Sequence, residues 1–316
     1  MNFIVLYCNK NQYEMLEEFT FKYSPVDFSK VDILIYDDNS IDEQKDKLRK
    51  LCNEHSNLTW INPNVSSDID NPVVSSFECA DNYLLKNNIN SNWILFFEND
   101  VFPFKSNFWE ELDNTIEKNN FLNEKVGLFG FSSYQKFNDG LKRTIGNPTI
   151  GRGCLLDGIL EKPHSGWYKD LSDDWYDADY FVVEVPNWQS VCVNRKLFRE
   201  NIEIDKEHKE RLLSVDSVSH QFMYKGFFNV VFPKLSIYHD SGYLKNKINI
   251  KIDNSYSRSN SSHEVFKNTW GWGWGYRNKN LRNEFSVSFP KYLNKIQNRL
   301  FYMNVNEGPK RIEDFE

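Results

Sequence analysis

Short apolar segments alternate with longer amphipathic segments over the first hundred residues. The apolar segments, which read as strands, are residues 3–8, 31–36, 58–61 and 93–97. The segments between them, whose apolar residues recur at helical spacing, are residues 11–22, 42–55 and 77–87. This alternation is typical of βαβ units, so it predicts an α/β fold with a mainly parallel sheet flanked by helices. Residues 93–97 are apolar throughout, which predicts a central strand buried on both faces.

The pattern loosens after Asp100. We expect further helices at residues 107–119, 195–201 and 216–225, and strands at residues 126–131, 191–193, 229–232 and 235–238. Residues 132–180 are rich in glycine and aromatic residues, so we expect a long loop region of the kind that carries function. From residue 243 the composition becomes polar, with helix-like spacing only near residues 292–302. We therefore expect a domain of residues 1–242 and a C-terminal extension, or lid, of residues 243–316.

Composition and charge narrow the classes of function. The 316 residues are 40% hydrophobic and 16% aromatic, which is enough apolar area for a large folded core. A formal net charge of −7 removes the broad attraction to phosphate backbones, so nucleic acid is a disfavoured partner and acceptor. No stretch reaches the roughly 18 apolar residues that a membrane span needs, and the five scattered cysteines show no CxxC spacing. We expect a cytoplasmic protein with no transmembrane segment and no disulfide framework.

The acidic triplet Glu98-Asn99-Asp100 follows the apolar strand at residues 93–97. Open α/β sheets bind ligands outside the carboxyl ends of their strands, which is where this triplet is expected. Two carboxylates at such a position can share one divalent cation with a diphosphate, because Mg²⁺ and Mn²⁺ prefer oxygen ligands. The alternative is a solvated acidic turn with no ligand.

A second polar cluster, Asp37-Asp38-Asn39-Ser40, follows the second expected strand. A carboxylate at this position could accept hydrogen bonds from a ribose hydroxyl or from a base N–H. The same four residue types also favour turns and helix caps, so a purely structural role is the alternative.

The chain order of these features resembles the nucleotide-sugar half of GT-A glycosyltransferases, most closely the inverting family-2 type. The first expected strand ends in Tyr7-Cys8-Asn9, the second in an acidic pair, and a later one in Glu98-Asn99-Asp100. The resemblance covers about residues 3–242. It implies a Rossmann-like GT-A fold, and it departs from the family in the Glu that begins the usual DxD motif and in the absence of a Gly-rich, Arg-containing segment after the third strand.

Site roles follow from the resemblance. It places Tyr7 and Asn9 beside the nucleoside and Asp38 on the uracil or ribose. Glu98 and Asn99 are assigned to the nucleotide, because the longer Glu side chain is able to reach the ribose, although Glu98 could also join Asp100 at the metal. Asp100 is the main metal-side carboxylate.

Two downstream residues also match the family's pattern. Asp216, before Lys225-Gly226, lies where family members place the base that takes the proton from the acceptor hydroxyl. His239, at the end of an expected strand, lies where many GT-A enzymes place a metal ligand, and an imidazole suits Mn²⁺ better than Mg²⁺. The alternatives are that Asp216 caps its helix and that His239 is structural.

Aromatic residues form the candidate acceptor side. In the string Trp270-Gly271-Trp272-Gly273-Trp274, an extended chain would place three indoles on one face, where they could bind a sugar ring. The same rings could instead pack the extension onto the catalytic domain. Trp188 and Gln189 lie where family members often line the acceptor pocket.

These features predict a glycosyltransferase that uses Mn²⁺ or Mg²⁺ and moves a sugar from a nucleoside-diphosphate sugar, by default a UDP-sugar, to a hydroxyl of a glycan or another acceptor. The resemblance to the inverting family-2 type implies that the transfer inverts the anomeric configuration. One alternative is a non-catalytic glycan-binding protein with a glycosyltransferase-like fold. The other is a sugar-phosphate nucleotidyltransferase, although Asn9-Lys10-Asn11-Gln12 lacks the Gly-rich, Arg-containing loop of those enzymes.

Overall fold

The computed structural model describes most of the expected domain and part of the end of the chain. The residues that it describes are 1–64, 71–137, 140–144, 173–183, 185–204, 211–240, 242, 246, 309 and 311–314. No helix within these ranges is long and apolar enough to cross a bilayer.

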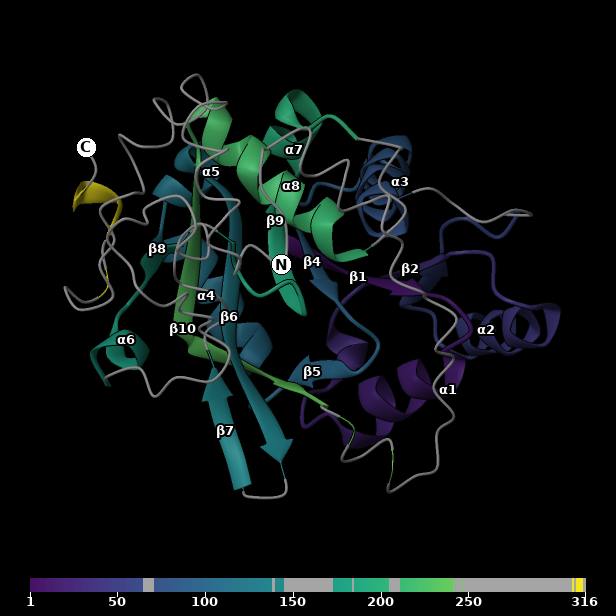
Figure 1. The fold of residues 1–316 in the computed structure, drawn as a ribbon. Coiled ribbons are helices and arrows are strands. Elements are labelled where there is room, and N and C mark those ends of the chain that lie inside the picture. Colours follow the sequence, from purple (N-terminus) through teal and green to yellow (C-terminus); the bar gives the residue numbers. More distant parts are fainter. Residues whose placement is uncertain are drawn as a thin grey trace, which may run out of the picture.

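One mixed sheet forms the centre of the molecule (Figure 1). Its strands are β1 (Phe3–Asn9), β2 (Ile33–Asp37), β3 (Leu58–Trp60), β4 (Trp93–Phe97), β5 (Val101–Pro103), β6 (Val126–Phe137), β7 (Gly140–Thr144), β8 (Phe181–Val183), β9 (Ser190–Asn194) and β10 (Phe228–His239). The strand order is β3-β2-β1-β4-β9-β6-β10-β5, with β7 paired to β6 and β8 paired to β10.

Six strands of the sheet run in the same direction. β1 pairs in parallel with β2 and β4, β2 pairs in parallel with β3, and β6 pairs in parallel with β10. β9 is antiparallel to both β4 and β6, so β6 and β10 have the direction of β4. The carboxyl ends of β1, β2, β4, β6 and β10 therefore share one edge of the sheet, and the first residue of β9 lies at that edge too. The predicted α/β class with a mainly parallel sheet is confirmed.

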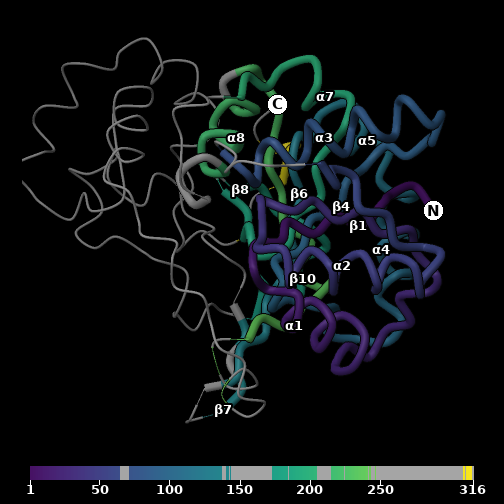
Figure 2. Tube along the Cα trace, turned by 90° about the vertical axis from the view of Figure 1, so that its right-hand side faces the viewer, coloured from purple at the N-terminus to yellow at the C-terminus, as the bar shows by residue number. Residues whose placement is uncertain are grey.

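Helices cover both faces of the sheet. They are α1 (Tyr13–Leu16), the π-helix η1 (Glu17–Tyr23), the 3₁₀ helix η2 (Phe28–Lys30), α2 (Asp42–Glu54), α3 (Pro72–Lys86), α4 (Phe108–Lys118), α5 (Phe121–Lys125), α6 (Asp173–Asp177), α7 (Arg195–Asn201), α8 (Arg211–Lys225) and the 3₁₀ helix η6 (Ile312–Asp314). Figure 2 shows α3, α7 and α8 above the strands, and α1, α2 and α4 below them.

The continuous apolar sequence of β4 matches this arrangement of two covered faces. Phe97 packs edge-on against Trp109 of α4, with ring centroids 6.4 Å apart. The preceding residue, Phe96, faces the other way and lies 5.6 Å from the ring of Phe77 in α3. Because successive side chains of a strand point to opposite faces, a strand covered on both sides must be apolar at every position.

Two segments differ from the sequence-based expectations. Part of the expected loop region continues β6 to Phe137 and returns as β7, because polar side chains of β6 are accommodated at the carboxyl edge of the sheet. The two strands expected at residues 229–232 and 235–238 form the single strand β10. Its pairing with β6 shifts register between Phe232 and Ser236, and this irregularity accommodates Pro233 within a strand.

The end of the chain packs against the main domain. Ile312 is 2% exposed and belongs to the large core cluster below the sheet. Tyr180 donates a hydrogen bond to Glu313 over 2.8 Å, and Arg311 forms an ion pair with Asp179 at 3.3 Å. These few residues of the expected extension therefore share the core of residues 1–242, while the expected helix near residues 292–302 lies outside the described residues.

Candidate active site

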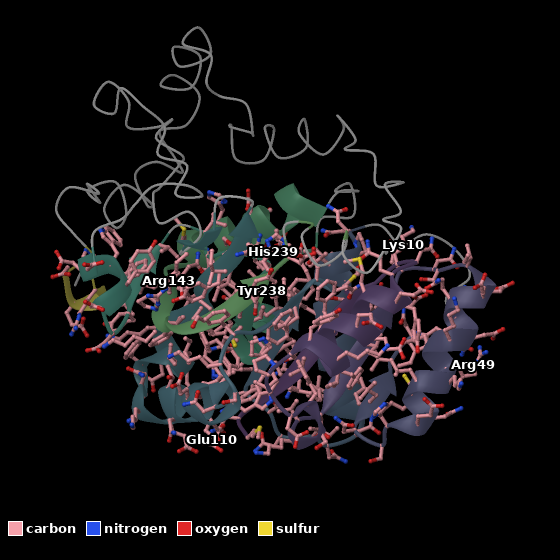
Figure 3. The ribbon with its side chains drawn as sticks, turned by 90° about the horizontal axis from the view of Figure 1, so that it is seen from below. Lys10, Arg49, Glu110, Arg143, Tyr238 and His239 are labelled. Atoms are coloured by element: carbon pink, nitrogen blue, oxygen red, sulfur yellow. The ribbon has the colours of Figure 1, made fainter. Side chains whose placement is uncertain are left out.

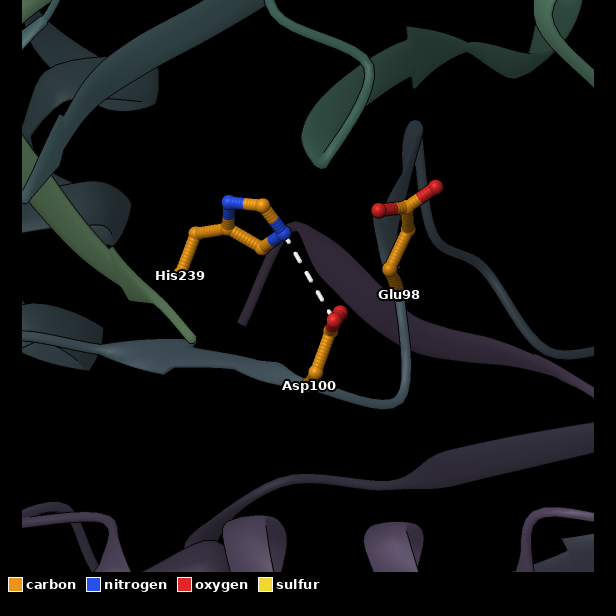
Figure 4. Close-up of side chains that lie close together, drawn as sticks. All are labelled: Glu98, Asp100 and His239. Atoms are coloured by element: carbon orange, nitrogen blue, oxygen red, sulfur yellow. Dashed lines mark ion pairs between the residues drawn. The ribbon is translucent and has the colours of Figure 1, made fainter. Parts of the chain in front are cut away.

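Two carboxylates and one imidazole meet at the carboxyl edge of the sheet. Glu98 and Asp100 follow β4 directly, and His239 is the last residue of β10. One ligand atom from each of the three side chains lies within 4.8 Å of the other two. Nε2 of His239 is 3.5 Å from Oδ2 of Asp100, and Figure 4 shows the imidazole facing both carboxylates. We call Glu98, Asp100 and His239 the cation cluster.

Strand pairing holds the cation cluster together. After Asp100 the chain enters β5, which pairs antiparallel with β10 so that Val101 lies opposite His239. The backbone N–H of Asp240 donates to the carbonyl of Asp100 over 3.0 Å. The backbone N–H of Glu98 donates to the carbonyl of Gln189 over 3.0 Å, which ties the acidic turn to the start of β9. Backbone hydrogen bonds therefore fix the position of each cluster residue.

The cation cluster fits a divalent cation. Ligand atoms that share one octahedral ion at about 2.1 Å are separated by roughly 3 to 4.2 Å, so small side-chain movements would bring these atoms to bonding distance. Carboxylate oxygens suit both Mg²⁺ and Mn²⁺, and an imidazole nitrogen favours Mn²⁺. The structure also places the carboxylate of Glu98 close to that of Asp100. The family resemblance had assigned Glu98 mainly to the nucleotide, with the metal as the alternative.

Gln189 contacts the imidazole of the cation cluster. Its Nε2 lies 2.7 Å from Nδ1 of His239, on the side of the ring away from Asp100. Its Oε1 accepts hydrogen bonds from Asn187 over 2.7 Å and from Ser133 over 3.3 Å. Metal-binding histidines are usually oriented by a hydrogen bond that the N–H of the second ring nitrogen donates. Gln189 accepts such a bond when its carboxamide turns its oxygen toward Nδ1, so it is the residue placed to orient the ring when Nε2 binds a cation.

A dense hydrogen-bond network lies at the ends of β1 and β2. Asn9 donates to Oδ1 of Asp37 over 2.9 Å, and Asp37 also accepts from the backbone N–H and the hydroxyl of Ser40. Asn99 donates to Oδ1 of Asn9 over 3.1 Å and to Gln12 over 3.2 Å. We call Asn9, Asp37, Ser40 and Asn99 the polar turn. It joins the exits of β1, β2 and β4, so these three chain segments are held in one arrangement.

Asp38 and Lys10 lie next to the polar turn. Nζ of Lys10 is 3.2 Å from Oδ2 of Asp38, and the Asp38 side chain is almost fully buried. Figure 3 shows Lys10 at the same edge of the molecule as His239, while Glu110 in α4 lies at the opposite edge. The candidate nucleotide residues and the cation cluster therefore share one edge.

Tyr7 has a different environment from the other candidates. Its side chain is fully buried in the core, and its ring stacks on Phe97 at 5.7 Å. Burial raises the pKa of its phenol well above the usual range. This position favours packing beneath the site over contact with a nucleoside, so the nucleoside role of Tyr7 stays a prediction.

Asp216 lies within α8 and is 5% exposed. The helix begins at Arg211, earlier than expected, so Asp216 does not cap it and that alternative is wrong. The backbone carbonyl of Asp216 accepts a hydrogen bond from Nδ1 of His220 over 2.7 Å. A Cβ on Gly127 of β6 would lie 2.2 Å from the ring of Phe222, so glycine at this position lets α8 approach the sheet closely.

Trp188 connects α8 with the segment that reaches the cation cluster. Its indole N–H donates to the hydroxyl of Ser219 over 3.1 Å, and its ring packs edge-on against Phe77 at 6.1 Å. The next residue, Gln189, contacts His239. Trp188 is therefore largely buried beside the site, and its acceptor role stays a prediction. Trp270, Trp272 and Trp274 lie outside the described residues.

Two comparisons of the sequence found no match. No protein-family model matches it, and no curated protein sequence matches it. Solved structures do match it. GalNAc-T7 with UDP, GalNAc and Mn²⁺ has a TM-score of 0.52 and 12% identity, over 94% of this chain and 56% of that chain. The chain has the GT-A glycosyltransferase fold.

Two other GT-A structures are more distant in shape. The mannosyltransferase PcManGT from Pyrobaculum calidifontis, in complex with GDP-Man and Mn²⁺, has a TM-score of 0.46 and 11% identity over 75% of this chain and 56% of that chain. S. aureus TarS 1-349 with UDP-GlcNAc has a TM-score of 0.47 and 14% identity over 76% of this chain and 59% of that chain. The chain spans less than two thirds of the length of each of these GT-A proteins.

Several residues at this GT-A site were not singled out by the sequence. Asp37 belongs to the polar cluster that the sequence indicated, but the ligand role was given to its neighbour Asp38, whereas Asp37 organises the polar turn. Ser133 and Gln135 fell within the expected loop. The strand was predicted from apolar residues, and the part of β6 that reaches the binding edge of the sheet is polar, so nothing in the sequence indicated that the strand continues there.

Proposed function

We propose that the protein is a metal-dependent glycosyltransferase that moves a sugar from a nucleoside-diphosphate sugar to an acceptor hydroxyl. The observation that carries this proposal is the convergence of Glu98, Asp100 and His239 within 4.8 Å, at the ligand-binding edge of a GT-A sheet. The GalNAc-T7 structure is one with UDP, GalNAc and Mn²⁺. A UDP-sugar and Mn²⁺ are therefore the donor class and the cation that we propose for this chain.

The donor would extend along the carboxyl edge of the sheet. Asn9 and Asp38, at the exits of β1 and β2, would bind the base and ribose, with Asn99 supporting Asn9. Glu98, Asp100 and His239 would hold the cation, which would neutralise the charge that develops on the departing diphosphate. This division follows the order of the strands, because β1 and β4 are neighbours in the sheet.

Asp216 is our proposed base. Its carboxylate would take the proton of the acceptor hydroxyl while the hydroxyl oxygen bonds to the anomeric carbon and the bond from that carbon to the diphosphate oxygen breaks. Attack from the face opposite the leaving group would invert the configuration. The hydrogen bond from Trp188 to α8 supports this role, because Trp188 and Gln189 link the helix of Asp216 with His239.

The acceptor side would be completed by Trp188 and Gln189. Trp270, Trp272 and Trp274, in the expected extension of residues 243–316, would add a stacking platform for a sugar acceptor. We place the reaction in the cytoplasm.

Calorimetry tests the nucleotide part of the proposal. Purified protein is titrated with UDP, GDP, CDP and TDP, each with and without Mn²⁺. We expect one diphosphate, UDP by default, to bind only when Mn²⁺ is present. Binding of none of the four would contradict the proposal and favour a protein that binds glycans without transferring them.

The base is tested separately with Asp216→Asn. This variant should bind the nucleotide with wild-type affinity and transfer sugar about 100- to 10,000-fold more slowly, because general base catalysis contributes on that order. Transfer at the wild-type rate would exclude Asp216 as the base. The exposed Asp174→Asn, on α6, is the matched control and should retain full activity.

A further inference from the structure

Gln135 is a buried polar residue that the proposed mechanism does not use. It lies near the carboxyl end of β6 and is 2% exposed. Nε2 of its carboxamide is buried and has no hydrogen-bond partner among the residues that the structure describes. Buried donors are normally paired, because an unpaired donor destabilises the folded state. An exception of this kind requires a physical explanation.

Gln135 lies beside His239 in the sheet. β6 and β10 are parallel there, and the register places Gln135 opposite His239. Neighbouring strands are about 4.8 Å apart, so the two side chains start from adjacent positions. The candidate cation ligand of β10 therefore has the unpaired amide of β6 as its neighbour.

Gln135 and His239 also point to the same face of the sheet. Ser133, two residues before Gln135, donates to Gln189, and Gln189 contacts His239. Tyr134 lies between them in sequence and faces the other way, where its ring stacks on Phe104 at 4.1 Å. Because side chains alternate along a strand, Gln135 shares the face of Ser133 and of the cation cluster.

We infer that Gln135 donates a hydrogen bond from Nε2 to a hydroxyl of the transferred sugar and so selects the donor sugar. This inference rests on the proposed function. β6 lies two strands beyond β4, on the side away from the polar turn of β1 and β2. A donor with its base at the polar turn and its diphosphate at the cation cluster has its sugar directed toward β6.

The chemistry of the amide fits a sugar hydroxyl. Glu98, Asp100 and His239 would hold a cation that offsets the diphosphate charge, so the diphosphate does not need the amide of Gln135 as a donor. A neutral N–H in a buried position pairs well with a neutral hydroxyl. A site built around such a bond strongly rejects a ligand that lacks the hydroxyl, because the buried donor is then left unpaired.

The test compares a sugar nucleotide with its diphosphate. Calorimetry with Mn²⁺ measures the affinity of wild type and of Gln135→Met for UDP and for UDP-GlcNAc, UDP-GalNAc, UDP-glucose, UDP-galactose and GDP-Man. In the variant we expect the preferred sugar nucleotide to bind about tenfold more weakly and the diphosphate to bind within about twofold of wild type. The differences in affinity among the five sugar nucleotides should become smaller in the variant than in wild type.

Controls keep the test decisive. Gln221→Met, on α8 and bonded to the backbone of Glu203, should leave every affinity unchanged. If Gln135→Met does not fold in a thermal melt, Gln135→Asn keeps the amide but withdraws it by one methylene and should show the same selective loss. Unchanged binding of all ligands would overturn the inference, and so would an equal loss for the diphosphate.

The two proposals can fail independently. If the wild-type protein binds none of the diphosphates or sugar nucleotides, the proposed function is wrong and the role of Gln135 is overturned with it. If wild type binds a sugar nucleotide and the Gln135 variants bind it equally well, only the role of Gln135 is wrong, and its amide is satisfied by a structural water.

Discussion

The polar turn and the cation cluster lie at the same edge of the sheet, yet their side chains are arranged differently. In the polar turn, Asp37 accepts three hydrogen bonds from Asn9 and Ser40, so its charge is satisfied within the protein. In the cation cluster, the carboxylates of Glu98 and Asp100 are held close to each other and to one imidazole. The first arrangement stabilises the fold, whereas the second brings like charges together.

This difference indicates which residues support the site and which act in it. Two carboxylates close to each other repel, and that cost is offset when an opposite charge binds between them. Local features that oppose stability are expected where a protein binds its ligand. Substitutions in the polar turn should therefore lower stability, and substitutions in the cation cluster should lower ligand binding without lowering stability.

Asp100→Ala should give the largest effect. We expect Mn²⁺-dependent binding of the diphosphate to be lost and donor turnover to fall about 100- to 1,000-fold, because the charge on the leaving group is no longer stabilised. The melting temperature should stay the same or rise, since one of two neighbouring carboxylates is removed. Calorimetry and a thermal melt measure both quantities. Asp46→Ala, an exposed substitution on α2, is the control, and wild-type turnover by Asp100→Ala would refute the cation site.

Asp37→Ala should show the opposite pattern. Its loss leaves buried donors of Asn9 and Ser40 unpaired, so we expect the free energy of unfolding to fall by about 3 kcal/mol. Urea denaturation measures this change. Nucleotide affinity, measured well below the melting temperature, should fall much less. A variant with wild-type stability and no nucleotide binding would show that Asp37 is itself a ligand residue and not a support.

Gln189→Leu should have a smaller and more specific effect. Without the contact at Nδ1, His239 is oriented less well, and the affinity for Mn²⁺ should fall about tenfold. Saturating Mn²⁺ should restore nucleotide binding, which distinguishes positioning of the histidine from general damage. Unchanged Mn²⁺ affinity combined with a raised KM for the acceptor would instead support the acceptor role expected from the sequence.

Tyr7→Phe should have the smallest effect. The ring of Tyr7 stacks on Phe97 within the core cluster below the sheet, so its hydroxyl lies in that core and not among the residues of the cation cluster. We expect the affinity for the diphosphate to stay within about twofold of wild type, measured by the same calorimetry. A loss of tenfold or more would show that Tyr7 contacts the nucleoside, as the resemblance to family-2 enzymes predicts.

Local sequence patterns were sufficient for much of the fold. The apolar segments of β1, β2 and β4, and the helical spacing between them, predicted a mainly parallel sheet, because burial on both faces requires apolar residues at every strand position. The acidic turn of Glu98 and Asp100 was identified from its place directly after a buried strand, because polar residues at that place mark the ligand edge of an α/β sheet. His239 was singled out through the resemblance, because many GT-A enzymes place a metal ligand at the end of the corresponding strand.

Only the tertiary structure decided which of these residues meet. β5 pairs with β10, and this long-range contact brings His239 to Asp100, while the antiparallel β9 carries Gln189 to the imidazole. The face of Gln135 likewise depends on the register of β6 with β10. A sequence pattern reports burial and alternation within one segment, whereas register and strand order arise from packing between segments that are distant along the chain.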